Sequence, residues 1–238
     1  MTDHRPFHFK HFSLLHHQST MKVGTDAMLL GSWIKLNGTR QILDIGAGCG
    51  IISLILAQRC NASIDAVEID EKSVNEANVN FKASCWHQRL KCYHTDIKIF
   101  ANNYPKKYDL IISNPPFYTS DFKTKTSQRK LARHTDSLDF KSLIQSVKLL
   151  LSSDGRFALV LPIPEAQLFI KLAKKENIFL TTQREIFSIE GKSTNRWNLI
   201  FSFTKPQNIE FETFIIKYID GNYTETYKLL LKDFYLGL

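Results

Sequence analysis

Cysteine is scarce in this chain, with four among 238 residues. The four stand singly, at Cys49, Cys60, Cys85 and Cys92. This spacing lacks the close pairs of a zinc site, and the number is too small for a disulfide framework. We therefore expect reduced, mostly buried thiols in a cytoplasmic protein.

Long apolar runs and repeats are missing as well. Apolar runs such as Ile51 to Ala57 are far shorter than the ~20 residues of a membrane span, and the chain starts with the polar run Met1 to Arg5. We expect a soluble, unexported monomer with no membrane partner. Without repeats, low-complexity tracts or linkers, residues 1–238 should form one domain, with an N-terminal cover (1–38), a catalytic core (39–205) and a C-terminal tail (206–238).

No metal site is expected. The histidines at positions 4, 8 and 11 have near-helical spacing, but phenylalanines at 7, 9 and 12 interleave with them. This pattern predicts an aromatic segment that packs on the sheet or on RNA.

Acidic residues are outnumbered, and the formal net charge is +8. A basic excess favours polyanionic partners. The excess is concentrated between Phe122 and His134, which carries no carboxylate but contains Lys123, Lys125, Arg129, Lys130 and Arg133. A solvated loop is the alternative interpretation of this stretch.

Short apolar runs alternate with helical patterns, which predicts a doubly wound α/β fold with a mostly parallel seven-stranded sheet. The expected strands are 41–45, 63–69, 90–94, 108–113, 155–161, 179–187 and 197–204. The expected helices are 51–59, 71–83, 140–151 and 165–176, with others starting near Asp26 and Thr224. The last two strands follow each other without a helix, so the last strand should be antiparallel.

A glycine-rich turn joins the first strand to a helix in the run Ile42 to Gly50. Gly46, Gly48 and Gly50 allow a ligand to approach the backbone closely, and the helix offers free N–H groups. Asp44 precedes the glycines, where it would repel a pyrophosphate but suits an ammonium.

Acids also stand at the ends of the next two strands. Glu68, with Ile69 beside it, is placed to accept bonds from ribose hydroxyls, and Asp96 could accept the adenine amino group. Together with Asp44 they describe S-adenosylmethionine better than NAD. The alternatives are a surface acid at Glu68 and a helix N-cap at Asp96.

The run Asn114-Pro115-Pro116-Phe117 follows the fourth strand. The Asn114 side-chain carbonyl and the Pro115 backbone carbonyl can accept both N–H bonds of a planar amine and aim its lone pair at a methyl donor. The prolines restrict the backbone, and Phe117 could stack on a base that has left its own stack. The alternative is a turn that only ends the strand.

These motifs resemble those of class I methyltransferases. Four segments outside these motifs resemble the bacterial tRNA1(Val) (adenine(37)-N6)-methyltransferase family. They are residues 9–12, 21–33, 129–136 and 233–236. The resemblance implies S-adenosylmethionine as cofactor, the tRNA anticodon stem-loop as partner, and methylation of the adenine beside the anticodon. The alternatives are a protein glutamine N5-methyltransferase, another RNA base amine methyltransferase, and an RNA-binding module without catalysis.

The resemblance also assigns residues outside these motifs. Lys22, Thr25 and Asp26 would lie over the cofactor cleft, although Thr25 and Asp26 could instead cap the following helix. The resemblance also places Arg133 and His134 at the RNA entrance. The other residues expected to bind RNA are Lys123, Arg129 and Lys130 of the basic stretch, and Lys192 and Arg196 of a polar turn between the last two strands. Lys192 and Arg196 could instead belong to an ordinary solvated hairpin.

Overall fold

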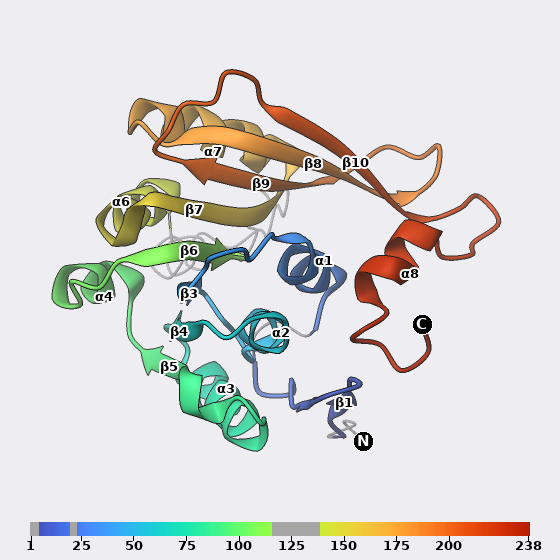
Figure 1. Cartoon of the computed structure of the whole chain (residues 1–238), viewed down its shortest axis with the longest axis horizontal. Coiled ribbons are helices and arrows are strands. Elements are labelled where there is room, and N and C mark those ends of the chain that lie inside the picture. The colour runs from blue at the N-terminus through green and yellow to red at the C-terminus, as the bar shows by residue number, and fades with distance from the viewer. Residues whose placement is uncertain (1–4, 20–22, 116–138) are drawn as a thin grey trace, which may run out of the picture.

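The computed structural model describes residues 5–19, 23–115 and 139–238. Its centre is an eight-stranded sheet with the order β10-β8-β9-β7-β6-β3-β4-β5 (Figure 1). The strands are β3 (Gln41–Ile45), β4 (Ser63–Glu68), β5 (Leu90–His94), β6 (Tyr108–Ser113), β7 (Leu151–Pro162), β8 (Phe179–Ile189), β9 (Arg196–Ser202) and β10 (Glu210–Lys217). Strands β5, β4, β3, β6 and β7 are parallel, and β9 is antiparallel to both β7 and β8. The doubly wound α/β fold and the antiparallel β9 are confirmed.

The prediction of seven strands is wrong by one strand. β10 lies in the segment predicted as a tail and pairs in parallel with β8 at the edge of the sheet. Only Phe214 among its residues is buried. An edge strand with one buried side chain has little of the apolar pattern that identifies a strand in a sequence.

Helices cover both faces of the sheet (Figure 1). One face carries α1 (Thr25–Trp33), α2 (Ile51–Arg59), α3 (Glu71–Ala83) and α8 (Glu225–Leu231), and the other carries α4 (Ile97–Asn103), α6 (Phe140–Leu150) and α7 (Ile163–Lys175). Successive strand residues face opposite sides, so Ile42 belongs to the first hydrophobic cluster and Leu43 to the second. Burial on both faces explains why the central strands are mostly apolar and do not alternate apolar with polar residues.

The N-terminal aromatic segment packs against the C-terminal end of the chain. It contains the hairpin of β1 (Phe7–His8) and β2 (Ser13–Leu14). The Phe9 ring stacks on Phe12 with centroids 4.5 Å apart and on Tyr235 with centroids 5.8 Å apart. The Lys10 backbone N–H donates to the Phe234 carbonyl at 2.8 Å.

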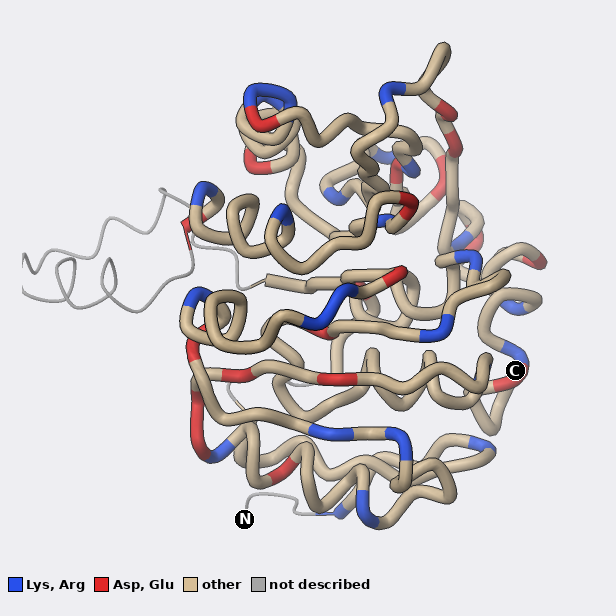
Figure 2. The backbone as a smooth tube through the Cα atoms, turned by 60° about the vertical axis from the view of Figure 1, so that its left-hand side comes forward, with Lys and Arg blue, Asp and Glu red and all other residues tan. Residues whose placement is uncertain are grey.

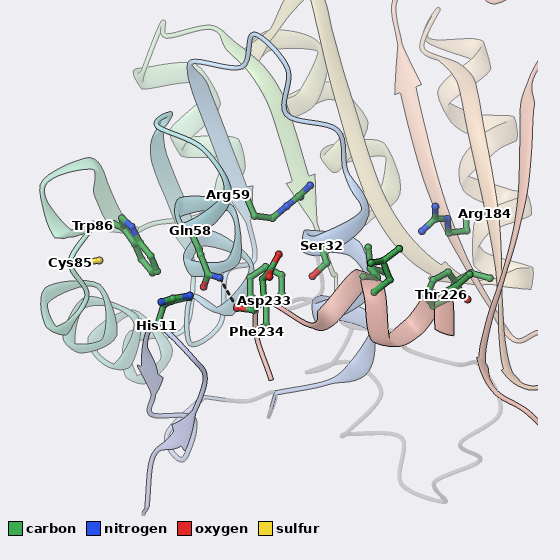
Figure 3. Close-up of a pocket in the computed structure, with 13 residues that line it drawn as sticks. His11, Ser32, Gln58, Arg59, Cys85, Trp86, Arg184, Thr226, Asp233 and Phe234 are labelled. Carbon is green, nitrogen blue, oxygen red and sulfur yellow. Dashed lines mark hydrogen bonds between the residues drawn. The ribbon is translucent and has the colours of Figure 1, made fainter. Parts of the chain in front are cut away.

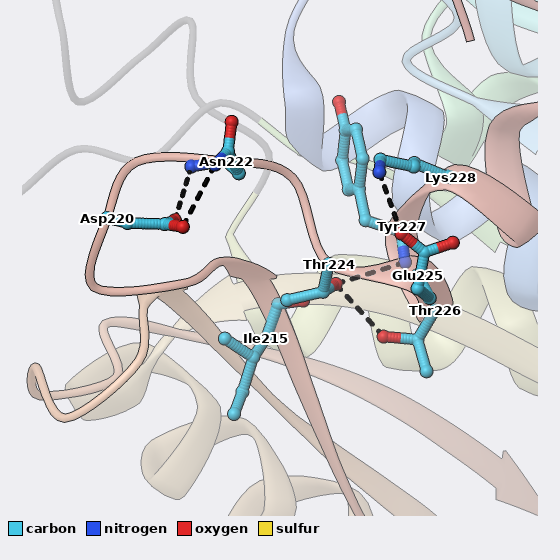
Figure 4. A network of polar contacts seen from close by, with 8 residues as sticks. All are labelled: Ile215, Asp220, Asn222, Thr224, Glu225, Thr226, Tyr227 and Lys228. Carbon is cyan, nitrogen blue, oxygen red and sulfur yellow. Dashed lines mark hydrogen bonds and ion pairs between the residues drawn. The ribbon is translucent and has the colours of Figure 1, made fainter.

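The helix predicted near Thr224 is α8, and Thr224 is its N-cap (Figure 4). The Thr224 hydroxyl accepts the Tyr227 N–H at 3.2 Å and donates to the Ile215 carbonyl at 2.6 Å. One side chain therefore both starts the helix and holds it on β10.

Lysines, arginines and acids lie interspersed along the chain in Figure 2.

No helix within the described ranges is long and apolar enough to cross a membrane.

Candidate active site

Asp44, Glu68 and Asn114 lie near the carboxyl ends of three neighbouring parallel strands, β3, β4 and β6. Strand pairing aligns Ile45 of β3 with Val67 of β4 and with Ser113 of β6. The Ser113 hydroxyl donates to the Ile45 carbonyl at 2.8 Å, which fixes the end of β6 beside the glycine turn. The three predicted motifs therefore meet at the carboxyl ends of the parallel strands. This is the edge of the sheet where ligands of open α/β sheets bind.

The glycine turn has three left-handed residues. Gly46, Gly48 and Gly50 have φ values of +71°, +55° and +83°, which side chains disfavour. The Gly46 N–H donates to the Val67 carbonyl at 2.8 Å, and the Gly48 N–H donates to Glu68 Oε2 at 2.9 Å. Gly50 is the N-cap of α2. The turn is therefore held against the end of β4 by its own backbone.

Alanine at Gly50 should destabilise the fold more than alanine at Gly46. Both substitutions force a side chain into a left-handed conformation, at a cost of about 1–2 kcal/mol. A Cβ at Gly46 meets nothing within 4 Å, whereas at Gly50 it lies 2.9 Å from Cζ of the Phe81 ring. Overpacking should add a further 1–3 kcal/mol, roughly, for Gly50→Ala. Urea unfolding measures the difference, and equal losses for the two variants would contradict it.

The two carboxylate oxygens of Asp44 differ in their contacts. Its Oδ2 accepts the Ser53 hydroxyl of α2 at 2.7 Å, while the buried Oδ1 has no partner in the part of the chain that the structure describes. The side chain is 0% exposed, and this burial raises its pKa to about 7. Hydrogen bonds from Ser53 act in the opposite direction, and repulsion from Glu68 adds slightly to the rise. A buried acceptor without a partner fits a cationic ligand group beside the glycine turn.

Sequence analysis did not identify Ser53, the partner of Asp44. The available signal was one small polar residue in the first turn of an otherwise apolar helix, in the run Ile51-Ile-Ser-Leu54. That signal could have been found, because the first turn of α2 follows the glycine turn directly.

Glu68 is buried, so the alternative of a surface acid is wrong. Its Oε1 accepts the N–H groups of Ile69 and Asp70 at 2.8 and 2.9 Å, and its Oε2 accepts the Gly48 N–H. A carboxylate has about four lone-pair sites, so Oε2 can take one further bond. The Ile69 side chain is 57% exposed at the same edge of the sheet.

Asp96 has the capping role that was the alternative to a ligand contact. Its Oδ1 accepts the Lys98 N–H at 2.7 Å at the start of α4, and Lys98 Nζ lies 3.4 Å from Oδ2. The contact with an adenine amino group remains a prediction.

Asn114 follows β6 directly. Its Oδ1 atom is buried and has no hydrogen-bond partner among the described residues, and Pro115 beside it is buried. A buried carbonyl oxygen without a partner is uncommon in folded proteins. The acceptor role of the Asn114 side-chain carbonyl toward a substrate amine remains a prediction.

Thr25 and Asp26 begin α1, but neither caps it. The N-cap is Gly24, without a side-chain cap, so the capping alternative is wrong. Asp26 Oδ2 instead lies 3.1 Å from Arg196 Nε. Arg196 pairs with Pro162 at the end of β7, so this ion pair ties α1 to the ligand-binding edge of the sheet.

The turn that holds Lys192 connects the antiparallel strands β8 and β9, and Lys192 is exposed. The hairpin geometry is as expected, and the phosphate contacts of Lys192 and Arg196 remain predictions.

Eight predicted site residues lie outside the described residues: Lys22, Pro116, Phe117, Lys123, Arg129, Lys130, Arg133 and His134.

All four cysteines are free, and two of them, Cys49 and Cys92, are buried. Burial raises the pKa of the Cys49 thiol beside the glycine turn to about 12, so it is no nucleophile at neutral pH. Within 5–19, 23–115 and 139–238, no His, Cys, Asp and Glu side chains group as a metal site would require.

The structure also has a cavity of about 910 Å³, whose lining is drawn in Figure 3. Gln58 and Arg59 from the far end of α2 line it, together with Thr226 and Leu230 of α8. No predicted site residue that the structure describes lines this cavity, so the cavity is not used to locate the site.

Comparisons with known proteins agree with the geometry. Residues 16–163 match the model of the family described as "Methyltransferase small domain". The chain is 42% identical to the tRNA1(Val) (adenine(37)-N6)-methyltransferase of Flavobacterium psychrophilum, over 98% of this chain and 100% of the relative. It is 37% identical to the protein of that name from Bacteroides fragilis, over 98% of both chains.

Solved structures show the same fold. A predicted O-methyltransferase from Agrobacterium tumefaciens aligns with a TM-score of 0.67 at 17% identity, over 88% of this chain and 96% of that one. A glycopeptide N-methyltransferase in complex with S-adenosylmethionine aligns with a TM-score of 0.57 at 12% identity, over 80% and 98%. The fold is that of S-adenosylmethionine-dependent methyltransferases, and the chain belongs to the tRNA1(Val) (adenine(37)-N6)-methyltransferase family.

Proposed function

We propose that this protein methylates N6 of an adenine in tRNA, at position 37 of tRNA1(Val), with S-adenosylmethionine as donor. The observation that carries the proposal is the buried, unpartnered Oδ1 of Asn114 at the end of β6, beside the glycine turn. Family membership supplies the substrate, because the curated relatives carry this activity in their names. We further propose that the protein acts in the cytoplasm as a monomer on the anticodon stem-loop.

The residues at the carboxyl edge fit the methyl donor. Asp44 Oδ1 would accept its ammonium, and the remaining lone pair of Glu68 Oε2 would accept a ribose hydroxyl. The exposed Ile69 side chain offers an apolar surface for the adenine ring, and Asp96 would accept its amino group. When bound, S-adenosylmethionine supplies a methyl group on a positively charged sulfur.

Asn114 and Pro115 would prepare the acceptor amine. The lone pair of an adenine amine is delocalised into the ring, so the nitrogen is a poor nucleophile. Two carbonyl acceptors, the Asn114 side chain and the Pro115 backbone, would take its two N–H bonds and favour tetrahedral geometry. The proton is lost after transfer, so no general base is required. Phe117 would stack on the flipped base.

Incubation with total tRNA and methyl-labelled donor, followed by nucleoside analysis, tests the proposal. We expect labelled N6-methyladenosine, and a tRNA1(Val) transcript with guanine in place of adenine 37 should take no label. Ribonuclease treatment of the substrate before the reaction should abolish incorporation, which a protein glutamine substrate would survive. Labelled N2-methylguanosine, or no labelled nucleoside, would contradict the proposal.

A further inference from the structure

The segment 15–19, between β2 and α1, is held by a buried carboxylate of α3. Glu76 Oε1 accepts the N–H groups of His17 and Gln18 at 2.7 and 3.0 Å, and Glu76 Oε2 accepts the N–H of Ser19 at 2.9 Å. Glu76 is 5% exposed. Three successive N–H groups directed at one carboxylate fix the backbone conformation of this segment.

Asn80, one turn further along α3, joins the same segment to the glycine turn. Its Oδ1 accepts the Leu15 N–H at 2.8 Å, and its Nδ2 donates to the carbonyls of Leu15 and Cys49 at 2.8 and 2.9 Å. Asn80 is 2% exposed. Because Cys49 lies between Gly48 and Gly50, Asn80 sets the position of the segment relative to the turn.

Ser19 is the residue that these contacts place over the glycine turn. A Cβ on Gly48 would lie 3.8 Å from Ser19 Oγ. Ser19 is 9% exposed, and its Oγ is buried without a hydrogen-bond partner within 5–19, 23–115 and 139–238. Glu68 Oε2 accepts the N–H of the same Gly48. A buried hydroxyl without a partner is explained if a bound ligand completes its hydrogen bond.

We propose that Ser19 donates a hydrogen bond to the amino-acid end of the bound methyl donor, and that Glu76 and Asn80 are positioning residues for Ser19. The inference rests on the proposed use of S-adenosylmethionine. A hydroxyl beside the glycine turn suits the donor's carboxylate, while Asp44 takes the ammonium. A carboxylate buried only for packing would be costly compared with an apolar side chain, whereas Glu76 uses both oxygens to fix the backbone that carries Ser19.

Binding of two probes by calorimetry tests the role of Ser19. S-adenosylhomocysteine carries the amino-acid end, and 5′-methylthioadenosine lacks it. Ser19→Ala should weaken S-adenosylhomocysteine about tenfold, the effect of one hydrogen bond to a charged group, and leave 5′-methylthioadenosine within twofold. Equal loss for both probes, or no loss for either, would overturn the assignment.

Glu76→Gln tests the positioning role. It should reproduce the selective loss of S-adenosylhomocysteine affinity, and Ser19→Ala combined with Glu76→Gln should be hardly weaker than Ser19→Ala alone, because both changes remove the same contact. Glu71→Gln is the matched control, since Glu71 is exposed on the same helix and should bind as wild type. Additive losses, or a loss for both probes, would show that Glu76 is only structural.

Binding of S-adenosylhomocysteine to the wild-type protein distinguishes failure of the proposed function from failure of the role assigned to Ser19. If it binds no S-adenosylhomocysteine, the proposed function itself fails. If it binds and Ser19→Ala binds equally well, the proposed function stands and the role of Ser19 is rejected. Should Glu76→Gln fail to fold, as judged by circular dichroism, the Ser19→Ala comparison still decides the contact.

Discussion

Asn114→Ala is expected to lower kcat for methyl transfer by roughly 100- to 1,000-fold, the loss seen when one oriented polar group is removed from an active site. The reason is the unpartnered Oδ1 at the end of β6, which alanine deletes. Affinity for S-adenosylhomocysteine should stay within about twofold, because the glycine turn, Asp44 and Glu68 are untouched. Single-turnover kinetics with labelled donor, together with calorimetry, measure the two quantities separately.

Two further variants support the interpretation of the Asn114→Ala result. Asn114→Asp retains an acceptor oxygen in the same place and should keep more activity than Asn114→Ala. Asn78→Ala removes an exposed amide on α3 and should react as wild type. Wild-type turnover by Asn114→Ala would reject the role of the side-chain carbonyl.

As the pH increases toward 7, the affinity for S-adenosylmethionine should increase about tenfold per pH unit. Above pH 7 the affinity should level off. Burial raises the pKa of Asp44 to about 7, so at pH 6 most of the free protein holds a neutral carboxyl there. A cationic ligand favours the ionised form, so binding below pH 7 releases a proton. Above about pH 8 the donor's own amine begins to lose its proton, which places the optimum between. Calorimetry over pH 5.5–8.5 would contradict this if affinity were flat.

The same carboxyl should make the ligand-free protein less stable as pH rises. The folded-state pKa of about 7 exceeds the model-compound value of 3.8, so the folded state binds more protons than the unfolded state between these values. Stability from this group is present below pH 4 and is lost as pH rises through 7. At pH 8 the free energy of unfolding of Asp44→Asn, measured by urea denaturation, should therefore exceed that of the wild type by up to about 4 kcal/mol. The variant should bind S-adenosylmethionine at least tenfold more weakly.

Asp65 provides the matched comparison. It is also buried, on β4, but it is bonded by Lys106 Nζ at 2.7 Å and by the Tyr108 hydroxyl at 2.8 Å. Asp65→Asn should lower stability at pH 8, because the carboxylate there has partners. If both substitutions changed stability in the same direction, the account of Asp44 as an uncompensated acid would be rejected.

Where burial and local turn chemistry agree, the sequence predicts the structure closely. The bounds of β3, β5 and β6 and of α2 and α3 are those expected. Largely apolar runs mark β3, β6 and α2, and the acid Asp70 caps the amphipathic helix α3. Strand β10 was missed because only one of its residues is buried. Helix α4 was considered only as the alternative in which Asp96 is an N-cap, because seven residues are too few to show a clear helical period.

The partners of the site residues were less predictable. Asp44, Glu68 and Asn114 were found from local motifs, and the parallel sheet brings them to one edge. The ion pair of Asp26 with Arg196 joins residues far apart in the chain, and no local pattern signals it. The bonds from Glu76 and Asn80 to segment 15–19 likewise depend on how α3 packs against the N-terminal cover.

The contacts between the two ends of the chain have a consequence for folding during synthesis. Ser19, Asp44, Glu68 and Asn114, and the α3 side chains that hold segment 15–19, are all made before half of the chain is complete. The β1–β2 hairpin instead needs Phe234 and Tyr235, which are synthesised more than 100 residues later. We therefore expect the ligand-binding edge to begin assembling during synthesis before the hairpin can dock.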